Sequence, residues 1–172
     1  MKKLLCVMLV LLLVPSCLAE GLDFSSMTPE EALDVINAAR NALAKAPVEG
    51  ELLRYESPDG YTLIFTGLSD NRKHDTCYIE VIFINDTDID LKAHSIDAYV
   101  NGWACRLTVA SNVNAHRRAS DRWFFSFDSV GISSIDEIED IEIYLSVYKA
   151  DGSYRTDALE IQTPLILTIG GE

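Results

Sequence analysis

From Tyr61 onward, apolar and polar residues alternate along the chain, and this two-residue period constrains the fold more than any other feature. Alternation places every second side chain on the same face of a β-strand, so one face can be buried while the other meets solvent. Turn-forming residues interrupt the pattern at intervals of about ten residues. The pattern predicts seven strands, at residues 61–67, 76–85, 89–100, 103–110, 121–128, 139–149 and 157–168.

The turn residues between these segments predict antiparallel pairing. Asn101-Gly102 is the strongest hairpin signal, because a tight type I′ turn needs positive φ at both central residues. Asp151-Gly152 is a second hairpin signal, and a further hairpin turn is assumed over 85–88. Pro164 predicts that the last strand lies at an edge or carries a bulge. The sequence therefore predicts a mainly β protein, an antiparallel immunoglobulin-like sandwich of about seven strands preceded by one short α-helix.

The short helix is predicted by Thr28-Pro29-Glu30-Glu31, which combines a capping hydroxyl, an N-terminal proline and a glutamate three residues after the cap. It should end near Ala46, because Pro47 disfavours helical geometry in the residue before it. Its narrow apolar stripe fits a helix packed on its own domain, and a stalk or docking helix is the alternative. We expect residues 20–50 to form this helix and a linker, and residues 51–172 to form the sandwich.

The amino terminus has the pattern of a signal peptide over residues 1–19. Lys2 and Lys3 precede an apolar run over 4–14 that is too short to span a bilayer. Small residues favour cleavage after Ala19 and release of the protein, whereas cleavage before Cys17 would leave a lipid-anchored protein. Either product is extracytoplasmic, with no transmembrane segment in the mature chain.

The charge balance excludes several classes of partner. The chain carries a formal net charge of −13, and removal of residues 1–19 takes away two lysines and no acid. An acidic protein of this kind is repelled by nucleic acid and by anionic lipid. The expected partner is therefore a protein or a glycan, although an acidic surface also simply keeps an exported protein soluble.

Two cysteines, Cys77 and Cys105, remain in the predicted mature chain. Outside the cell, such a pair suggests a disulfide. With hairpin turns at 85–88 and 101–102, however, Cys77 lies opposite Ile96 and Cys105 opposite Ala98, so the sulfurs lie on either side of a shared strand, too far apart to bond. This register predicts two thiols, with the disulfide as the alternative.

Three stretches give the chain a family resemblance. They are FINDTDIDL (83–91), SIDAYVNGW (95–103) and GISSIDEIEDIEIYLSVY (131–148). In this order and spacing they resemble an uncharacterised immunoglobulin-like β-sandwich domain of exported proteins of Gram-positive bacteria. The resemblance spans about residues 61–168. It implies export and an immunoglobulin-like fold, and it implies no catalytic activity.

The sequence contains no common catalytic motif, and we expect a protein that is not an enzyme. Asp86, Asp88 and Asp90 are the candidate metal ligands, because alternate carboxylates suit a hard cation such as Ca²⁺. No other cofactor is expected. The alternatives to a binding module are thus a calcium-stabilised structural module and a carboxylate-dependent hydrolase, whose paired acids have no spacing signature.

Two groups of side chains are candidates for binding a protein or a glycan. Tyr99 and Trp103 flank the tight turn, where exposed aromatic side chains would mark a ligand site, unless Trp103 caps the core. The basic run His116, Arg117 and Arg118 either pairs with the acidic loop at 86–90 or accepts an acidic partner. The sequence thus predicts an exported, non-catalytic binding module that acts at or outside the cell surface.

Overall fold

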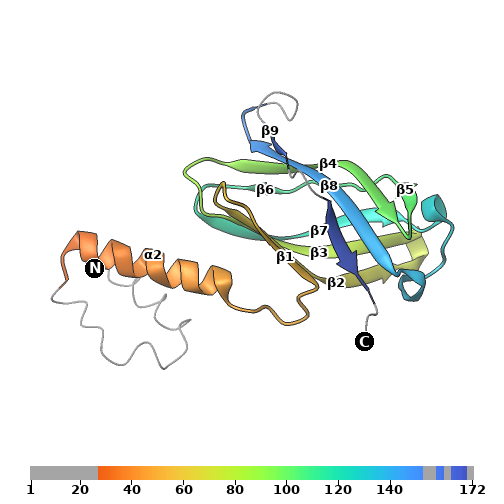
Figure 1. Cartoon of the computed structure of the whole chain (residues 1–172), viewed down its shortest axis with the longest axis horizontal. Coiled ribbons are helices and arrows are strands. Elements are labelled where there is room, and N and C mark those ends of the chain that lie inside the picture. Colours follow the sequence, from red (N-terminus) through yellow and green to blue (C-terminus); the bar gives the residue numbers. More distant parts are fainter. Residues whose placement is uncertain (1–26, 153–157, 161–163, 170–172) are drawn as a thin grey trace. The chain divides into compact units, whose positions relative to one another are not determined.

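The structure is a computed structural model that describes residues 27–152, 158–160 and 164–169 (Figure 1). The predicted signal peptide, its cleavage site after Ala19 and the alternative lipidation site Cys17 lie outside the described residues. The chain divides after Ala46 into two compact units, the first containing the helix and the second containing the strands. The boundary falls just before Pro47.

Helix α2 (Pro29–Lys45) begins as the sequence predicts. Thr28 is the N-cap, its hydroxyl accepts a hydrogen bond from the Glu31 amide, and the Glu31 carboxylate accepts one from the Thr28 amide at 2.7 Å. This reciprocal capping satisfies two of the amides that a helix leaves unpaired at its start. Hydrogen bonds donated by the Thr28 amide and by the Thr28 hydroxyl to the Glu31 carboxylate lower the pKa of Glu31, because they favour its ionised form.

The strands form two antiparallel sheets (Figure 1). Sheet A has the order β1-β2-β3-β7, and sheet B has the order β10-β8-β4-β5, with β6 paired to β4 and β9 paired to β8. The strands of sheet A are β1 (Leu53–Glu56), β2 (Tyr61–Asn71), β3 (Thr76–Asn85) and β7 (Arg117–Ser126). Those of sheet B are β4 (Leu91–Val100), β5 (Trp103–Cys105), β6 (Asn112–Val113), β8 (Asp140–Lys149), β9 (Ala158–Glu160) and β10 (Leu165–Thr168). The short 3₁₀ helices are η1 (Arg72–His74), η2 (Asp128–Val130) and η3 (Ile135–Glu137).

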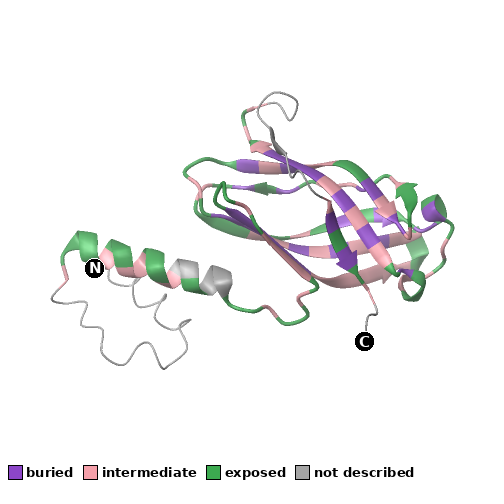
Figure 2. Ribbon diagram, viewed as in Figure 1, coloured by how far each residue is buried: buried purple, intermediate pink, exposed green. Residues whose placement is uncertain are grey.

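The core lies between the two sheets and follows the alternation of the sequence (Figure 2). On β8, Ile141, Ile143, Leu145 and Val147 are fully buried, and the residues between them face away from sheet A. Trp123 of β7 and Phe65 of β2 meet edge to face, with ring centroids 5.4 Å apart. Burial of large apolar side chains from both sheets is the main force that holds the sheets together.

The link between β3 and β4 corrects the sequence-based prediction, because residues 85–88 do not form a hairpin. β3 belongs to sheet A and β4 to sheet B, so the acidic loop, residues 86–90, crosses from one sheet to the other. Asn85 fixes this crossing: its buried amide donates to Ile89 O at 2.8 Å and to Val113 O at 2.9 Å. In a hairpin, backbone amides of the paired strand would bond such carbonyls; here the Asn85 side chain bonds them instead.

The turn at 101–102 confirms the predicted hairpin. Asn101 has φ 49° and Gly102 has φ 76°, and β4 and β5 pair across them. The strand expected over 103–110 is shorter than predicted, since β5 ends at Cys105. The chain then crosses the edge of the molecule, forms an isolated bridge between Thr108 and Phe124 of β7, and rejoins sheet B at β6.

Two further strands differ from the prediction. β1 pairs antiparallel with the first half of β2 and is absent from the predicted strands, because its apolar–polar alternation covers only four residues. The last predicted strand, 157–168, is split into β9 and β10, which both pair with β8 along the same edge of sheet B. Pro164, which immediately precedes β10, therefore lies at a sheet edge, as its missing amide hydrogen predicts.

Candidate functional site

The two aromatic residues at the tight turn lie on different sides of sheet B. Tyr99 pairs with Ala104 of β5 and Trp103 pairs with Val100, and residues directly opposite each other share a face. Val100 is buried in the core, so Tyr99 belongs to the outer face of the sheet. Trp103 is 68% exposed and does not cap the core, which excludes that alternative. The register therefore divides the predicted aromatic pair.

The ring that packs against Tyr99 is that of Tyr144 on β8. The two centroids are 6.2 Å apart and the planes meet at 77°, an edge-to-face contact. The Tyr144 hydroxyl donates a 2.5 Å hydrogen bond to Glu142 Oε1. This bond raises the pKa of Tyr144, and the nearby charges of Glu142 and Asp97 raise it further. All four side chains therefore lie together on the outer face of sheet B.

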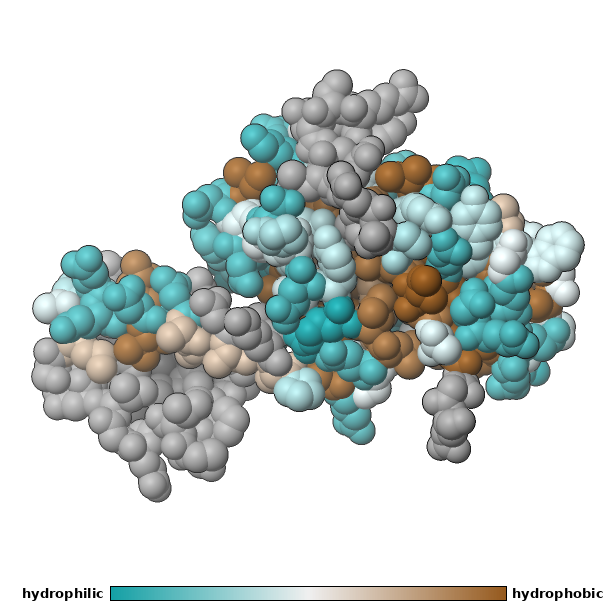
Figure 3. Space-filling view, in the orientation of Figure 1, coloured by the Kyte–Doolittle hydropathy of each residue, from teal (hydrophilic) through white to brown (hydrophobic). Residues whose placement is uncertain are grey.

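Small and aliphatic side chains border these four residues. Ile166 of β10 lies opposite Glu142 and is 53% exposed, and Ala104 of β5 is an exposed neighbour of Tyr99. Figure 3 shows apolar side chains over β10, next to hydrophilic ones. We call the set Tyr99, Tyr144, Glu142, Asp97, Ala104 and Ile166 the tyrosine patch.

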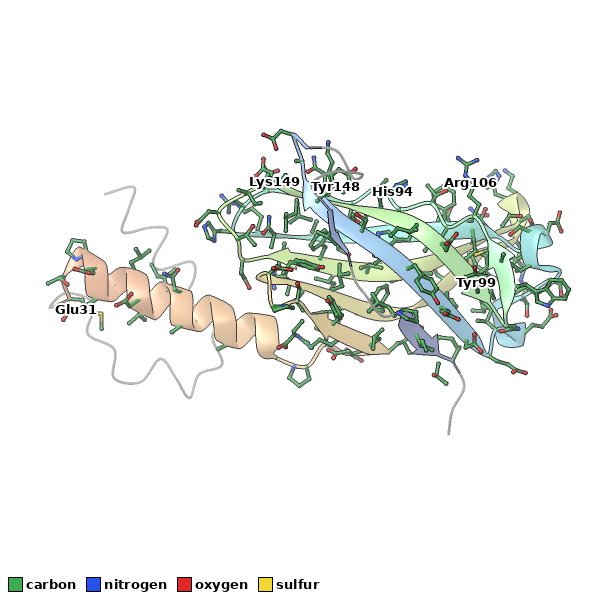
Figure 4. The ribbon with its side chains drawn as sticks, turned by 45° about the horizontal axis from the view of Figure 1, so that its top comes forward. Glu31, His94, Tyr99, Arg106, Tyr148 and Lys149 are labelled. Atoms are coloured by element: carbon green, nitrogen blue, oxygen red, sulfur yellow. The ribbon has the colours of Figure 1, made fainter. Side chains whose placement is uncertain are left out.

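Figure 4 shows how the tyrosine patch continues along sheet B: Tyr99, His94 and Tyr148 follow one another on the same side of the sheet. His94 pairs in register with Ser146, and Tyr148 pairs with Lys92. The outer face of sheet B is thus rich in aromatic and polar side chains along two neighbouring strands. Such a surface can stack against a ligand and form hydrogen bonds with it.

Sequence reasoning found Tyr99 but missed Tyr144 and Glu142. Both missed residues alternate with the buried Ile141 and Ile143, and this alternation was the signal that could have placed them on an exposed face. Their proximity to Tyr99 depends on the pairing of β4 with β8, across more than forty residues of sequence. No local pattern carries that information.

Within the basic run, His116 contacts the acidic loop, as one of the two interpretations predicts. His116 Nε2 lies 2.9 Å from Asp88 Oδ1, and Asp90 Oδ1 accepts a 2.8 Å hydrogen bond from the Ala115 amide. The predicted calcium site does not assemble: within residues 27–152, 158–160 and 164–169, no group of three or more His, Cys, Asp and Glu side chains could hold a metal ion. Asp86 thus lacks the convergent partners that a Ca²⁺ site needs.

Arg117 and Arg118 do not form a common site with the tyrosine patch. They begin β7, where Arg117 lies opposite Asn85 and Arg118 opposite Ile84, so consecutive arginines face opposite sides of sheet A. Another group of basic residues, Arg72–His74 of η1, lies at the other end of sheet A, since β3 and β7 pair there through Thr76 and Ser126.

Both cysteines of the strand region are free thiols. Cys105 lies opposite Ala98, as predicted, but Cys77 lies between Asp70 and Phe125 within sheet A instead of opposite Ile96. The error comes from the hairpin wrongly assigned to 85–88. Burial raises the pKa of Cys77 to about 12 and that of Cys105 to about 11, because a thiolate is poorly solvated in the core.

In the described part of the chain, the carboxyl groups with shifted pKa values are shifted toward the ionised form. The pKa values of Glu31, Glu51 and Glu137 are all lowered, mainly by hydrogen bonds to the ionised form from Thr28, Arg54 and Ser133. A catalytic acid of a glycosidase needs the opposite shift, toward neutrality.

Comparisons with known proteins assign no family to this chain. No protein-family model matches it, and no curated protein matches it. Among the described residues, no helix is both long enough and apolar enough to cross a membrane.

Proposed function

We propose that this protein is an exported, non-catalytic binding module that contacts a protein or a glycan through the outer face of sheet B. One observation carries the proposal: Tyr99 and Tyr144 pack together on a face that points away from the core, with Glu142 and Asp97 beside them. Aromatic side chains are enriched where proteins bind partners.

We also propose an immunoglobulin-like topology for the strand region. In that fold, strands A, B, E and D form one sheet and C, F and G the other. The order β2-β3-β7 corresponds to A-B-E, and β4-β8-β10 corresponds to C-F-G. The bridge from Thr108 to Phe124 of β7 occupies the position of strand D, and β1 is an additional strand at the edge. Because one architecture of this kind hosts many unrelated functions, the proposed binding role rests on the tyrosine pair and not on the topology.

A screen with two classes of ligand tests the proposed function. The protein from residue 20 onward is applied to an array of oligosaccharides and to a phage library of random peptides. Support is a hit of either class that Tyr99→Ala abolishes and that Phe124→Ala retains. Phe124 is the matched control, because it is a 40% exposed aromatic residue on the outer face of sheet A. The proposal would be overturned if Tyr99→Ala left the binding of every hit unchanged, or if neither class of ligand gave a hit.

The mass of the protein isolated from its own host tests export. A chain that begins at Glu20 is the expected result and identifies a released protein. A diacylglycerol adduct on Cys17 would instead identify a lipid-anchored protein. A chain that retains residues 1–19 in the cytoplasm would refute export.

A further inference from the structure

The surroundings of Tyr99 leave part of its ring available to a ligand. Tyr144 packs on it edge to face from β8, and this contact fixes the ring without covering its whole face. On the other side, the neighbour in register is Ala104, whose methyl group is exposed and too small to cover an aromatic ring. Tyr99 is therefore held in place by one neighbour and left open by the other.

The charged members of the tyrosine patch are both carboxylates. Glu142 lies directly opposite Tyr99, and Asp97 lies directly opposite Tyr144. Ionised carboxylates only accept hydrogen bonds, so they suit a ligand that presents hydroxyl or N–H donors. They repel a polyanion, as does the net charge of −13.

The tyrosine patch is also small compared with a protein–protein interface. One of its rows runs across four strands, from Ile166 through Glu142 and Tyr99 to Ala104. Three strand spacings make this row about 14 Å long. Ile166 is its one exposed large aliphatic side chain, whereas a stable protein interface needs a larger apolar centre.

From these features we infer that the tyrosine patch binds a linear, uncharged oligosaccharide laid across strands β10, β8, β4 and β5. A sugar ring has a C–H face that stacks on an aromatic side chain and hydroxyl groups that donate to carboxylates. The row supplies both kinds of contact, from Tyr99 and from Glu142. This inference rests on the proposed function, and it names the ligand class for the same face.

Titrations of the protein from residue 20 onward test the inference, with amide chemical shifts as the readout. The probes are cellotetraose, maltotetraose, mannotetraose and chitotetraose, with tetragalacturonate as the anionic comparison. We expect at least one neutral tetrasaccharide to shift the amides of β4 and β8, and tetragalacturonate to bind at least tenfold more weakly. Tyr99→Ala and Ala104→Glu should each weaken binding at least tenfold, and Phe124→Ala should leave it unchanged.

Three outcomes would overturn the inference: none of the neutral probes binds, tetragalacturonate binds equally well, or Phe124→Ala weakens binding as much as Tyr99→Ala. A lysine-rich peptide, titrated in parallel, separates this failure from failure of the proposed function. If the peptide alone binds and Tyr99→Ala abolishes its binding, the face is a binding surface for a different ligand. If the variants change the binding of no probe, both proposals fail.

Discussion

A buried hydrogen-bond chain between the two sheets offers the sharpest test of how the strands are held in place. Trp123 Nε1 donates to Ser111 Oγ at 2.8 Å, and Ser111 Oγ donates to Asp121 Oδ2 at 2.7 Å. Ser111 also accepts, through its carbonyl, a 3.1 Å bond from the Ala93 amide of sheet B. The Trp123 side chain is fully buried, so its indole N–H has no access to water.

Ser111→Ala should lower the free energy of unfolding by about 2 kcal/mol, because a buried donor left without an acceptor costs about 1–3 kcal/mol. The lost bond to Asp121 adds little, since that half-buried carboxylate can be solvated instead. Urea unfolding followed by tryptophan fluorescence measures the change, and the slope with urea should stay constant. In a Trp123→Phe background, Ser111→Ala should lower the free energy of unfolding much less, because no indole N–H remains to lose its acceptor.

Ser146→Ala is the matched control for this measurement. Ser146 is 1% exposed, and its hydroxyl has no hydrogen-bond partner in the described part of the chain. The same chemical change at an equally buried serine should therefore cost nothing or stabilise the protein slightly. If both variants lowered the free energy of unfolding equally, the reasoning would be refuted. Removal of any buried hydroxyl would then explain both losses, and the acceptor for the Trp123 indole would not matter.

Three further predictions concern other parts of the strand region. Iodoacetamide at pH 8 should modify Cys77 and Cys105 slowly in the native protein and rapidly in urea, because the raised pKa of each buried thiol leaves little reactive thiolate. Rapid labelling of either cysteine in the native protein would contradict its burial. Gly131→Ala should lower the free energy of unfolding by about 1 kcal/mol, because alanine is strained at positive φ. Gly50→Ala should lower it more, because the added Cβ would also lie 2.8 Å from Thr66 O. Equal urea midpoints for the two variants would refute this expectation. EDTA should leave the thermal midpoint unchanged, since the carboxylates of the acidic loop do not converge, and a lower midpoint with EDTA would restore the calcium alternative.

Local features of the fold could be predicted from the sequence because local physics decides them. The start of α2 follows from the capping residues around Thr28, and the turn at Asn101-Gly102 follows from the positive φ that it requires. Alternation located most strands, since burial of one face selects every second residue. β1 was missed because its alternation, Leu53-Arg54-Tyr55-Glu56, covers only four residues, too short a run to distinguish a strand from a loop.

The assignment of strands to sheets depends on contacts between distant residues. The segment after β3 contains turn-forming residues that suit a hairpin as well as a crossing. Asn85 decides the outcome through its bond to Val113 O, 28 residues away, and Asp86 donates its amide to Gly60 O. The same limit explains why Trp103 was grouped with Tyr99 and why Tyr144 was missed: the partners of each strand are set by the whole fold.

We propose that the outer face of sheet B around Tyr99 and Tyr144 is the surface that meets a ligand. Hydroxyl-radical footprinting of the protein, with and without the envelope fraction of the organism that produces it, tests this most directly. We predict that bound ligand protects Tyr99 and Tyr144 from oxidation and leaves Trp103 and Phe124 reactive. Protection of Trp103 or Phe124, with both tyrosines still reactive, would place the binding surface elsewhere and contradict the account.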